Sequence, residues 1–252
     1  MVKSLGKLAG AGVLVLGGML VLGLLFTKVL IDGPVGRLDD AIERGLASHR
    51  TATLNTLTSA GTALADTTTV TIALGVLVVL LALLTRRIAP PLFLVLAVGV
   101  ESAIYFVAST LIPRDRPHVP RLGPADPHAS YPSGHVAAAL CLYGGVAVLA
   151  GRCTRNRSLQ VALTLVAVIV PVIVAFCRMY RGFHHLTDIL AGLLLGGTWL
   201  WLCTRMLLDA RCWPPLPRAA GTGPSSRHPR DRPRARPRRP APLQGRFTGP
   251  PK

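Results

Sequence analysis

Three short polar strings in this sequence hold the residue types that a phosphoryl-transfer site needs. The first is Arg-Asp-Arg-Pro at 114–117, the second is Pro-Ser-Gly-His at 132–135, and the third combines Arg178, His184 and Asp188. Each string lies at an end of an apolar stretch. Together they supply cations for a phosphate, two imidazoles, a hydroxyl group and a carboxylate.

The arginines and the Ser-Gly pair are suited to binding phosphate. Phosphoryl transfer depends mostly on positioning and charge stabilisation, and arginine presents a planar, permanently charged fork that matches phosphate oxygens. We therefore expect Arg114, Arg116 and Arg178 to be phosphate ligands. Ser133 and Gly134 precede an apolar stretch, where the free N–H groups of a helix N-terminus would favour an anion.

The two histidines could provide a nucleophile and an acid. An imidazole can attack phosphorus when a carboxylate fixes its tautomer and stabilises the charge that develops. His184 and Asp188 are four residues apart and would share one face of a helix that begins near His184. His135 is the natural candidate to protonate the leaving group. Each string alone also fits a plainer interpretation, such as a helix cap or an interfacial ion pair, but their combination favours catalysis.

Membrane-spanning helices are the elements expected to position these strings. Half of the residues are hydrophobic and the mean hydropathy is +0.48, which is too apolar for an ordinary soluble domain. A bilayer-spanning helix needs about 20 mostly apolar residues. Six segments approach that length: 9–31, 69–85, 89–112, 133–150, 159–176 and 186–206. The expected fold class is therefore an all-α polytopic membrane protein, with its membrane domain over residues 9–207.

Basic residues near the span ends predict how these helices are oriented. With six spans, both termini and the following residues fall on one side: Lys3, Lys7, Arg86, Arg87, Arg152, Arg155, Arg157 and Arg205. We expect that side to be cytoplasmic, with a short N-terminus at 1–8, in a multi-pass protein of the cell membrane. The loops 32–68, 113–132 and 177–185 lie on the opposite side. Arginines in these outer loops depart from the positive-inside rule, and such departures often mark a functional site.

The first outer loop contains a helical pattern of its own. Apolar residues recur at roughly helical spacing, opposite a polar face: Val35, Leu38, Ile42 and Leu46 against Asp39, Asp40, Glu43 and Arg44. The pattern suits an amphipathic helix at the membrane interface, and equally a plain surface helix on a loop.

The segment 208–252 is rich in proline and arginine and carries a large share of the net charge of +17. Because it has almost no core-forming residues, we expect a disordered cytoplasmic tail. Its charge would attract anionic lipid headgroups or simply be solvated. Nucleic-acid binding is disfavoured, because prolines rather than aromatic residues are interleaved with the arginines. The five cysteines of the chain show no metal-ligand spacing.

Taken together, the strings resemble the motifs of the type 2 phosphatidic acid phosphatase superfamily of membrane lipid phosphatases, which is related to the vanadium haloperoxidases. The family motifs are Lys-x6-Arg-Pro, Pro-Ser-Gly-His and Ser-Arg-x5-His-x3-Asp. In this sequence they fall at 109–117, 132–135 and 177–188. Two positions depart from the family pattern, since Ser109 stands where the family has lysine and Cys177 stands where it has serine.

The resemblance implies a role for each matching residue. His184 would be the nucleophile that becomes phosphohistidine, Asp188 would orient it, and His135 would act first as general acid and then as the base that activates water. The implied phosphate ligands are Arg116, Arg178, Ser133 and Gly134, with Arg114 as a partial replacement for the missing lysine. No metal and no other cofactor is implied.

The expected function is hydrolysis of a lipid phosphate or diphosphate at the extracytoplasmic face of the membrane. Polyprenyl diphosphate, phosphatidate and phosphatidylglycerophosphate are the candidate substrates. One alternative is a lipid phosphotransferase, in which a hydroxyl group replaces water as acceptor. Another is a non-catalytic protein that binds or moves lipid phosphates.

Overall fold

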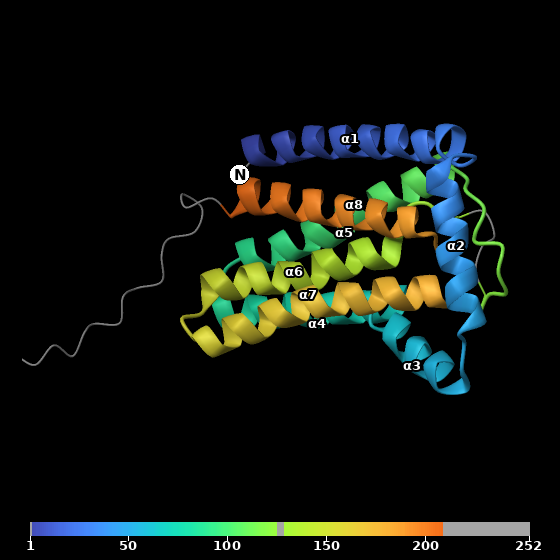
Figure 1. The fold of residues 1–252 in the computed structure, drawn as a ribbon. Helices are drawn as coiled ribbons and strands as arrows, with labels where there is room; N and C mark the ends of the chain where they lie inside the picture. The colour runs from blue at the N-terminus through green and yellow to red at the C-terminus, as the bar shows by residue number, and fades with distance from the viewer. Residues whose placement is uncertain (1, 125–128, 209–252) are drawn as a thin grey trace, which may run out of the picture. The chain divides into compact units, whose positions relative to one another are not determined.

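Helices joined by loops make up the computed structural model, which describes residues 2–124 and 129–208. Six helices in this part of the chain are long and apolar enough to cross a membrane (Figure 1). They are α1 (Val2–Leu24, continued by the π-helix η1, Leu25–Val29), α4 (Thr67–Thr85), α5 (Ala89–Leu111), α6 (Gly134–Cys153), α7 (Arg157–Tyr180) and α8 (Leu186–Leu207). The all-α, six-span prediction is confirmed, with bounds a few residues from those expected.

Helix α6 packs against α5, α7 and α8 and lies at the centre of the bundle. Small residues let α6 and α8 approach closely, as is usual between membrane helices. A Cβ atom added at Gly192 of α8 would lie 2.5 Å from the carbonyl oxygen of Ser133, and one at Gly196 would lie 2.8 Å from that of Ala137. Further along α8, the indole of Trp199 is buried and its Nε1–H donates to the carbonyl oxygen of Leu96 in α5 at 3.1 Å.

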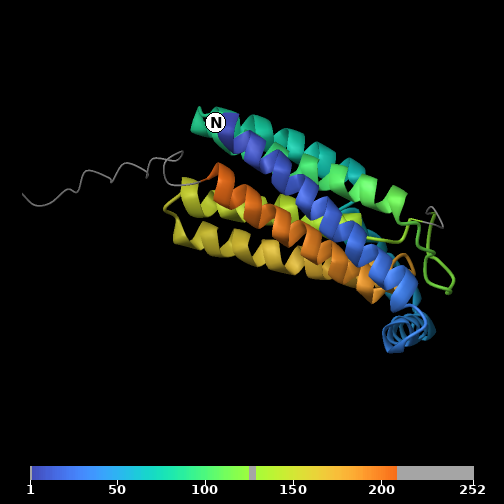
Figure 2. The same cartoon turned by 90° about the horizontal axis from the view of Figure 1, so that it is seen from above.

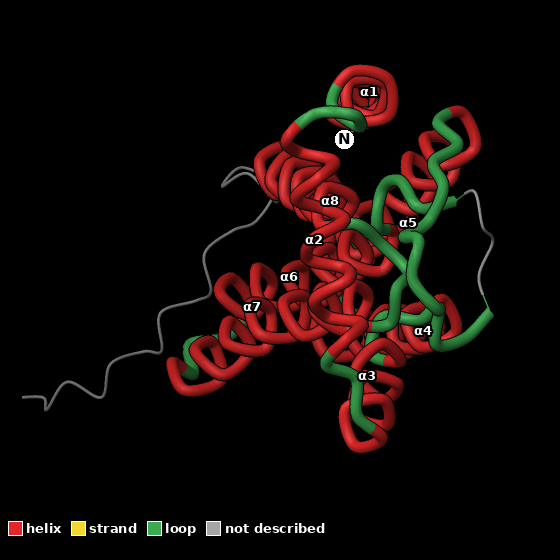
Figure 3. Tube along the Cα trace, turned by 45° about the vertical axis from the view of Figure 1, so that its right-hand side comes forward, coloured by secondary structure: helices red, strands yellow, loops and turns green. Residues whose placement is uncertain are grey.

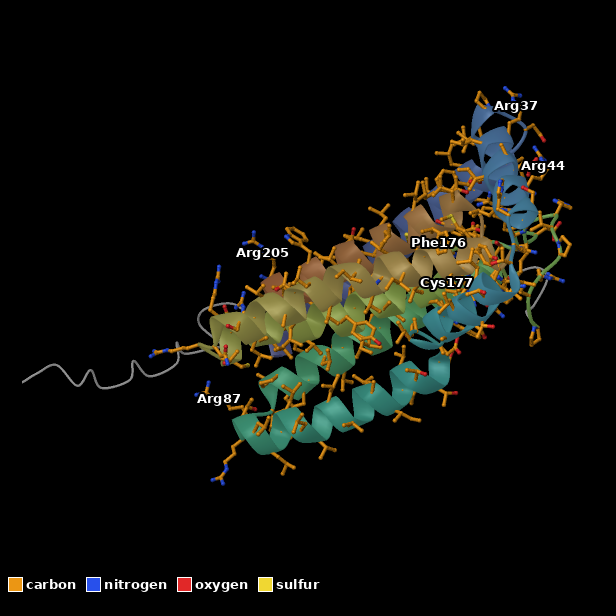
Figure 4. The ribbon with its side chains drawn as sticks, turned by 60° about the horizontal axis from the view of Figure 1, so that its bottom comes forward. Arg37, Arg44, Arg87, Phe176, Cys177 and Arg205 are labelled. Carbon is orange, nitrogen blue, oxygen red and sulfur yellow. The ribbon has the colours of Figure 1, made fainter. Side chains whose placement is uncertain are left out.

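Two shorter helices, α2 (Pro34–Ser48) and α3 (Ala52–Ala63), lie at one end of the bundle. Figure 3 shows them with the loop between α5 and α6 at the same end, and Figure 2 shows that α1 begins at the opposite end. In Figure 4, Arg87 and Arg205 lie at that opposite end, whereas Arg37 and Arg44 lie on α2. The outer loops of the sequence prediction are therefore gathered on one face of the bundle.

The orientation of α2 differs from the simple amphipathic pattern. The expected polar face is split, because Asp39 and Glu43 are buried against the bundle whereas Asp40 and Arg44 are exposed. Leu38, from the apolar stripe, is 54% exposed. Burial of two carboxyl groups is costly unless they are paired or hydrogen-bonded, so α2 must meet polar partners in the bundle.

The proline- and arginine-rich segment lies outside the described residues, apart from Leu208. Its interpretation as a disordered tail, and the domain limits that follow from it, stay predictions.

Candidate active site

The turn between α7 and α8 places His184 inside the end of the bundle. Helix α7 ends at Tyr180, and Gly182 follows with φ of +73°, a backbone conformation that suits glycine. The chain then turns inward, so that His184 is only 2% exposed. The Gly182 turn therefore brings this imidazole back beneath the outer loops before α8 begins.

Hydrogen bonding fixes the tautomer of His184. Its Nδ1 lies 2.7 Å from the carbonyl oxygen of Ser130, and since a carbonyl oxygen can only accept, Nδ1 carries the proton. Its Nε2 therefore has the lone pair, and lies 3.4 Å from Nη2 of Arg178. Burial, followed by the charges of Arg178 and Arg116, lowers the pKa of His184 well below its usual value. The ring is thus a neutral imidazole whose lone pair faces a cationic group.

Asp188 supports this imidazole through Ser130. The carboxylate accepts from Ser130 Oγ at 2.6 Å, from the backbone N–H of His185 at 2.9 Å and from Nη1 of Arg114 at 2.5 Å. Its nearest approach to His184 Nδ1 is 4.0 Å. The direct partner of the imidazole is therefore the Ser130 carbonyl, while Asp188 holds Ser130 and supplies negative charge nearby.

Arg116 and Arg178 meet around the ring of Phe183. The guanidinium of Arg178 stacks over this ring at 4.1 Å, and that of Arg116 lies 5.9 Å from the same centroid. Arg178 also donates through Nη1 to Thr62 Oγ1 at 3.3 Å, and Arg116 donates through Nη2 to the Ala129 carbonyl at 2.8 Å. These contacts bring the first and third strings together beside His184.

The second string joins the same site at the N-terminus of α6. Ser133 is the N-cap residue of α6, and its backbone N–H donates to the carbonyl oxygen of Asp188 at 3.0 Å. Gly134 begins the helix, and His135 Nε2 lies 3.0 Å from Oδ1 of Asp66. Asp66 is in turn the N-cap residue of α4.

Three buried donors in this cluster are left over. Ser133 Oγ, Arg178 Nε and Arg114 Nε have no hydrogen-bond partner within residues 2–124 and 129–208. Buried polar atoms are rarely left unpaired unless a ligand or water completes them. A hydroxyl group and a guanidinium N–H are both suited to the oxygens of an anion.

Arg114, which we expected among the phosphate ligands, has two carboxylate partners in the structure. Its Nη1 donates to Asp188 at 2.5 Å and to Thr187 Oγ1 at 2.7 Å, and its Nη2 donates to Asp39 at 3.1 Å. Its Nε atom has no hydrogen-bond partner in the described part of the chain, so a role for Arg114 as a phosphate ligand stays a prediction. Ser109, at the family lysine position, donates to the Phe106 carbonyl in its own helix, α5.

The sequence interpretation missed five residues that the structure brings to this site: Asp39, Thr62, Asp66, Ser130 and Thr187. Thr187 and Ser130 lie within or beside the motifs, and Asp39 lies in the helical pattern of the first outer loop, but none of the five was assigned a role in the site. The amphipathic pattern of the first outer loop singled out Asp39 as a polar residue, but it did not indicate which arginine Asp39 would meet.

A cavity of about 370 Å³ extends from His135 between the membrane-spanning helices. Its walls are mostly apolar and come from α4, α5 and α6, including Val70, Leu74, Val98, Tyr105 and Ala138. The site is therefore bordered by apolar space within the bundle.

Comparisons with known proteins identify the family and the fold. The family model described as the PAP2 superfamily matches residues 70–212. Among solved structures, the chain is similar to the first transmembrane PAP2 type phosphatidylglycerolphosphate phosphatase from Bacillus subtilis, with a TM-score of 0.65 and 23% sequence identity. The match covers 77% of this chain and 94% of that one, which shows a shared fold. No curated protein sequence matches the chain.

Proposed function

The chain belongs to the PAP2 superfamily, and on that premise we propose that it is an integral-membrane phosphatase that hydrolyses a lipid phosphate or diphosphate through a phosphohistidine. The observation that carries this proposal is the state of His184. Its Nδ1 proton is held by the Ser130 carbonyl at 2.7 Å, which leaves the Nε2 lone pair beside Arg178. A nucleophile of this kind, next to unpaired phosphate-type donors, fits phosphoryl transfer.

The first step forms a bond between His184 Nε2 and phosphorus and breaks the bond from phosphorus to the leaving oxygen. Arg116, Arg178, Ser133 and the start of α6 hold the phosphoryl oxygens as charge shifts among them. The imidazole becomes positively charged, and the Ser130 carbonyl and the Asp188 carboxylate stabilise that charge.

His135 moves the protons. In the first step its protonated ring gives a proton to the leaving oxygen, and the neutral ring then takes one from water. That water attacks the phosphohistidine, the phosphorus–nitrogen bond breaks, and His184 Nε2 regains its lone pair. Inorganic phosphate leaves and His135 is again protonated, so the cycle is balanced. Asp66 Oδ1 lies 3.0 Å from His135 Nε2, so a carboxylate is in place to stabilise the imidazolium form when it occurs.

A lipid substrate is favoured by the apolar cavity that adjoins His135 between α4, α5 and α6. An acyl or prenyl chain could occupy apolar space there while the phosphate meets the arginines. The similar Bacillus subtilis protein is a phosphatidylglycerolphosphate phosphatase by its title, so phosphatidylglycerophosphate is the first substrate to test. The basic residues at the α4–α5 and α6–α7 turns favour a cytoplasmic location for those turns, and hence an extracytoplasmic site.

Phosphate release by the purified protein tests this proposal. We expect release from at least one of phosphatidylglycerophosphate, phosphatidate and polyprenyl diphosphate, and loss of that release in His184→Asn. His49→Asn is the matched control, because His49 is exposed and, within the residues that the structure describes, its ring bonds to Ser48 and to the Gly45 carbonyl at the end of α2. Absence of release from all three lipids, or equal release by the wild type and His184→Asn, would overturn the proposal.

A further inference from the structure

Asp39 of helix α2 places a buried carboxylate against the first turn of α8. Asp39 accepts three hydrogen bonds there, from Thr187 Oγ1 at 2.6 Å, from the Thr187 backbone N–H at 3.1 Å and from Arg114 Nη2 at 3.1 Å. The Thr187 amide is one of the free N–H groups at the start of α8, where negative charge is favoured. Asp39 is therefore firmly bound to α8 and Arg114. It lies outside residues 70–212, the range that matches the family model.

Arg114 connects this carboxylate to the catalytic cluster. Its Nη1 donates to Asp188 at 2.5 Å and its Nη2 donates to Asp39 at 3.1 Å. The side chains of all three residues are almost fully buried. Asp188 holds Ser130, and the Ser130 carbonyl holds the Nδ1 proton of His184. A continuous series of buried contacts thus runs from α2 to the imidazole.

The charges along this series matter for the reaction. Asp39, Arg114 and Asp188 together carry two negative charges and one positive charge, so the group keeps a net negative charge beside a ring that must become cationic. If Asp39 were neutral, Arg114 would cancel Asp188. Electrostatic effects of this kind are strong where water is excluded.

We propose that Asp39 is a positioning residue of the site, which binds the outer nitrogen of Arg114 so that Asp188 and Ser130 keep His184 oriented and its developing charge stabilised. This inference rests on the proposed function. Asp39 acts through Arg114 and does not touch the substrate. Loss of the Asp39 carboxylate should therefore lower the rate of His184 phosphorylation more than it lowers the affinity for substrate.

The test compares Asp39→Asn with Asp40→Asn in single-turnover assays of the full-length protein with the lipid that wild type hydrolyses. Asp40 is the next residue on α2, is 51% exposed and pairs only with Arg44 among the contacts seen, so its substitution removes the same charge from the protein surface. We expect Asp39→Asn to slow phosphohistidine formation about tenfold, with KM unchanged, and Asp40→Asn to behave as wild type. If Asp39→Asn only reduced the fraction of folded protein, the amount of phosphoenzyme would fall and the rate constant for its formation would stay the same.

Asp39→Glu, which keeps the charge, should recover part of the rate lost in Asp39→Asn. Should Asp39→Asn fail to fold, Thr187→Val provides the second measurement, since it removes the hydroxyl that Asp39 and Arg114 share and keeps every charge. A slower rate constant with the same KM supports the inference there too. An unchanged rate constant in Asp39→Asn, or in Thr187→Val, overturns it. An inactive wild type would instead contradict the proposed function, and the inference would fall with it.

Discussion

The Nδ1 atom of His184 lies 2.7 Å from the carbonyl oxygen of Ser130, two residues before the Pro-Ser-Gly-His string. This contact decides which nitrogen of the ring is basic, because a backbone carbonyl can only accept a hydrogen bond. Ser130 also donates its hydroxyl to Asp188 at 2.6 Å. Ser130 thus joins the imidazole of His184 to the carboxylate of Asp188, which lies four positions later in the sequence.

Asp66 should matter for proton transfer by His135. Its Oδ1 lies 3.0 Å from His135 Nε2, so Asp66→Asn removes the negative charge that favours a protonated ring. We expect kcat to fall by about tenfold, a part of what general acid catalysis contributes, while KM changes little. Steady-state kinetics would test this, with Asp32→Asn as the control because Asp32 is exposed. A rise in KM with unchanged kcat would instead indicate a role in substrate binding.

Gly192 should be intolerant of a side chain. A Cβ atom there would lie 2.5 Å from the backbone oxygen of Ser133, so Gly192→Ala must push α8 away from the start of α6. Overpacking of this kind costs about 1–3 kcal/mol, and we expect both a lower Tm and reduced activity. Gly197→Ala in the same helix is the control, because its Cβ would make an ordinary contact of 3.7 Å with Leu140. Equal Tm values for the two variants would contradict the close approach of α6 and α8.

The docking of α2 should weaken as the pH rises. Burial, together with the nearby charges of Asp39, Asp40 and Asp188, raises the pKa of Glu43 from 4.5 to about 8. The folded protein therefore keeps a proton on Glu43 that the unfolded chain releases. The contribution of Glu43 to the free energy of unfolding is present below pH 4.5 and is lost progressively as the pH rises toward about 8. Glu43→Gln does not titrate. We expect the Tm of the wild type to fall relative to that of Glu43→Gln over this range.

His185, the partner of Glu43 at 3.1 Å, has the opposite dependence. Burial and the charge of Arg114 lower the pKa of His185 from 6.5 to about 3. Its contribution is therefore present above pH 6.5 and is lost as the pH falls toward about 3. Comparison of the wild type with Glu43→Gln above pH 6.5 isolates the carboxyl group. A constant difference in Tm across that range would contradict a buried, protonated Glu43.

The sequence predicted the membrane helices well, because apolar length is a strong signal that depends on no partner. It also predicted which loops share a face, since alternating spans and basic turns settle that arrangement. What it did not predict are contacts between distant segments. Asp39 and Glu43 looked like solvent-facing acids, and they are buried because Arg114, Thr187 and His185 lie where α2 crosses the bundle end.

Arg114 illustrates the same limit within a motif. Residue type indicated a cation that could bind an anion, but type says nothing about which anion a guanidinium will meet. Its carboxylate partners lie 75 and 74 positions away, one toward each end of the chain. The family membership was easier to predict, because the Pro-Ser-Gly-His string and the spacing of Arg178, His184 and Asp188 are local patterns.

Trapping the covalent intermediate tests the phosphohistidine mechanism most directly. The wild-type protein would be mixed with a radiolabelled lipid phosphate, quenched within one turnover and mapped by peptide mass spectrometry. We predict an acid-labile phosphate on His184, present in His49→Asn and missing from His184→Asn. Phosphate on a different residue, or undiminished turnover by His184→Asn, would contradict the assignment of His184 as the nucleophile.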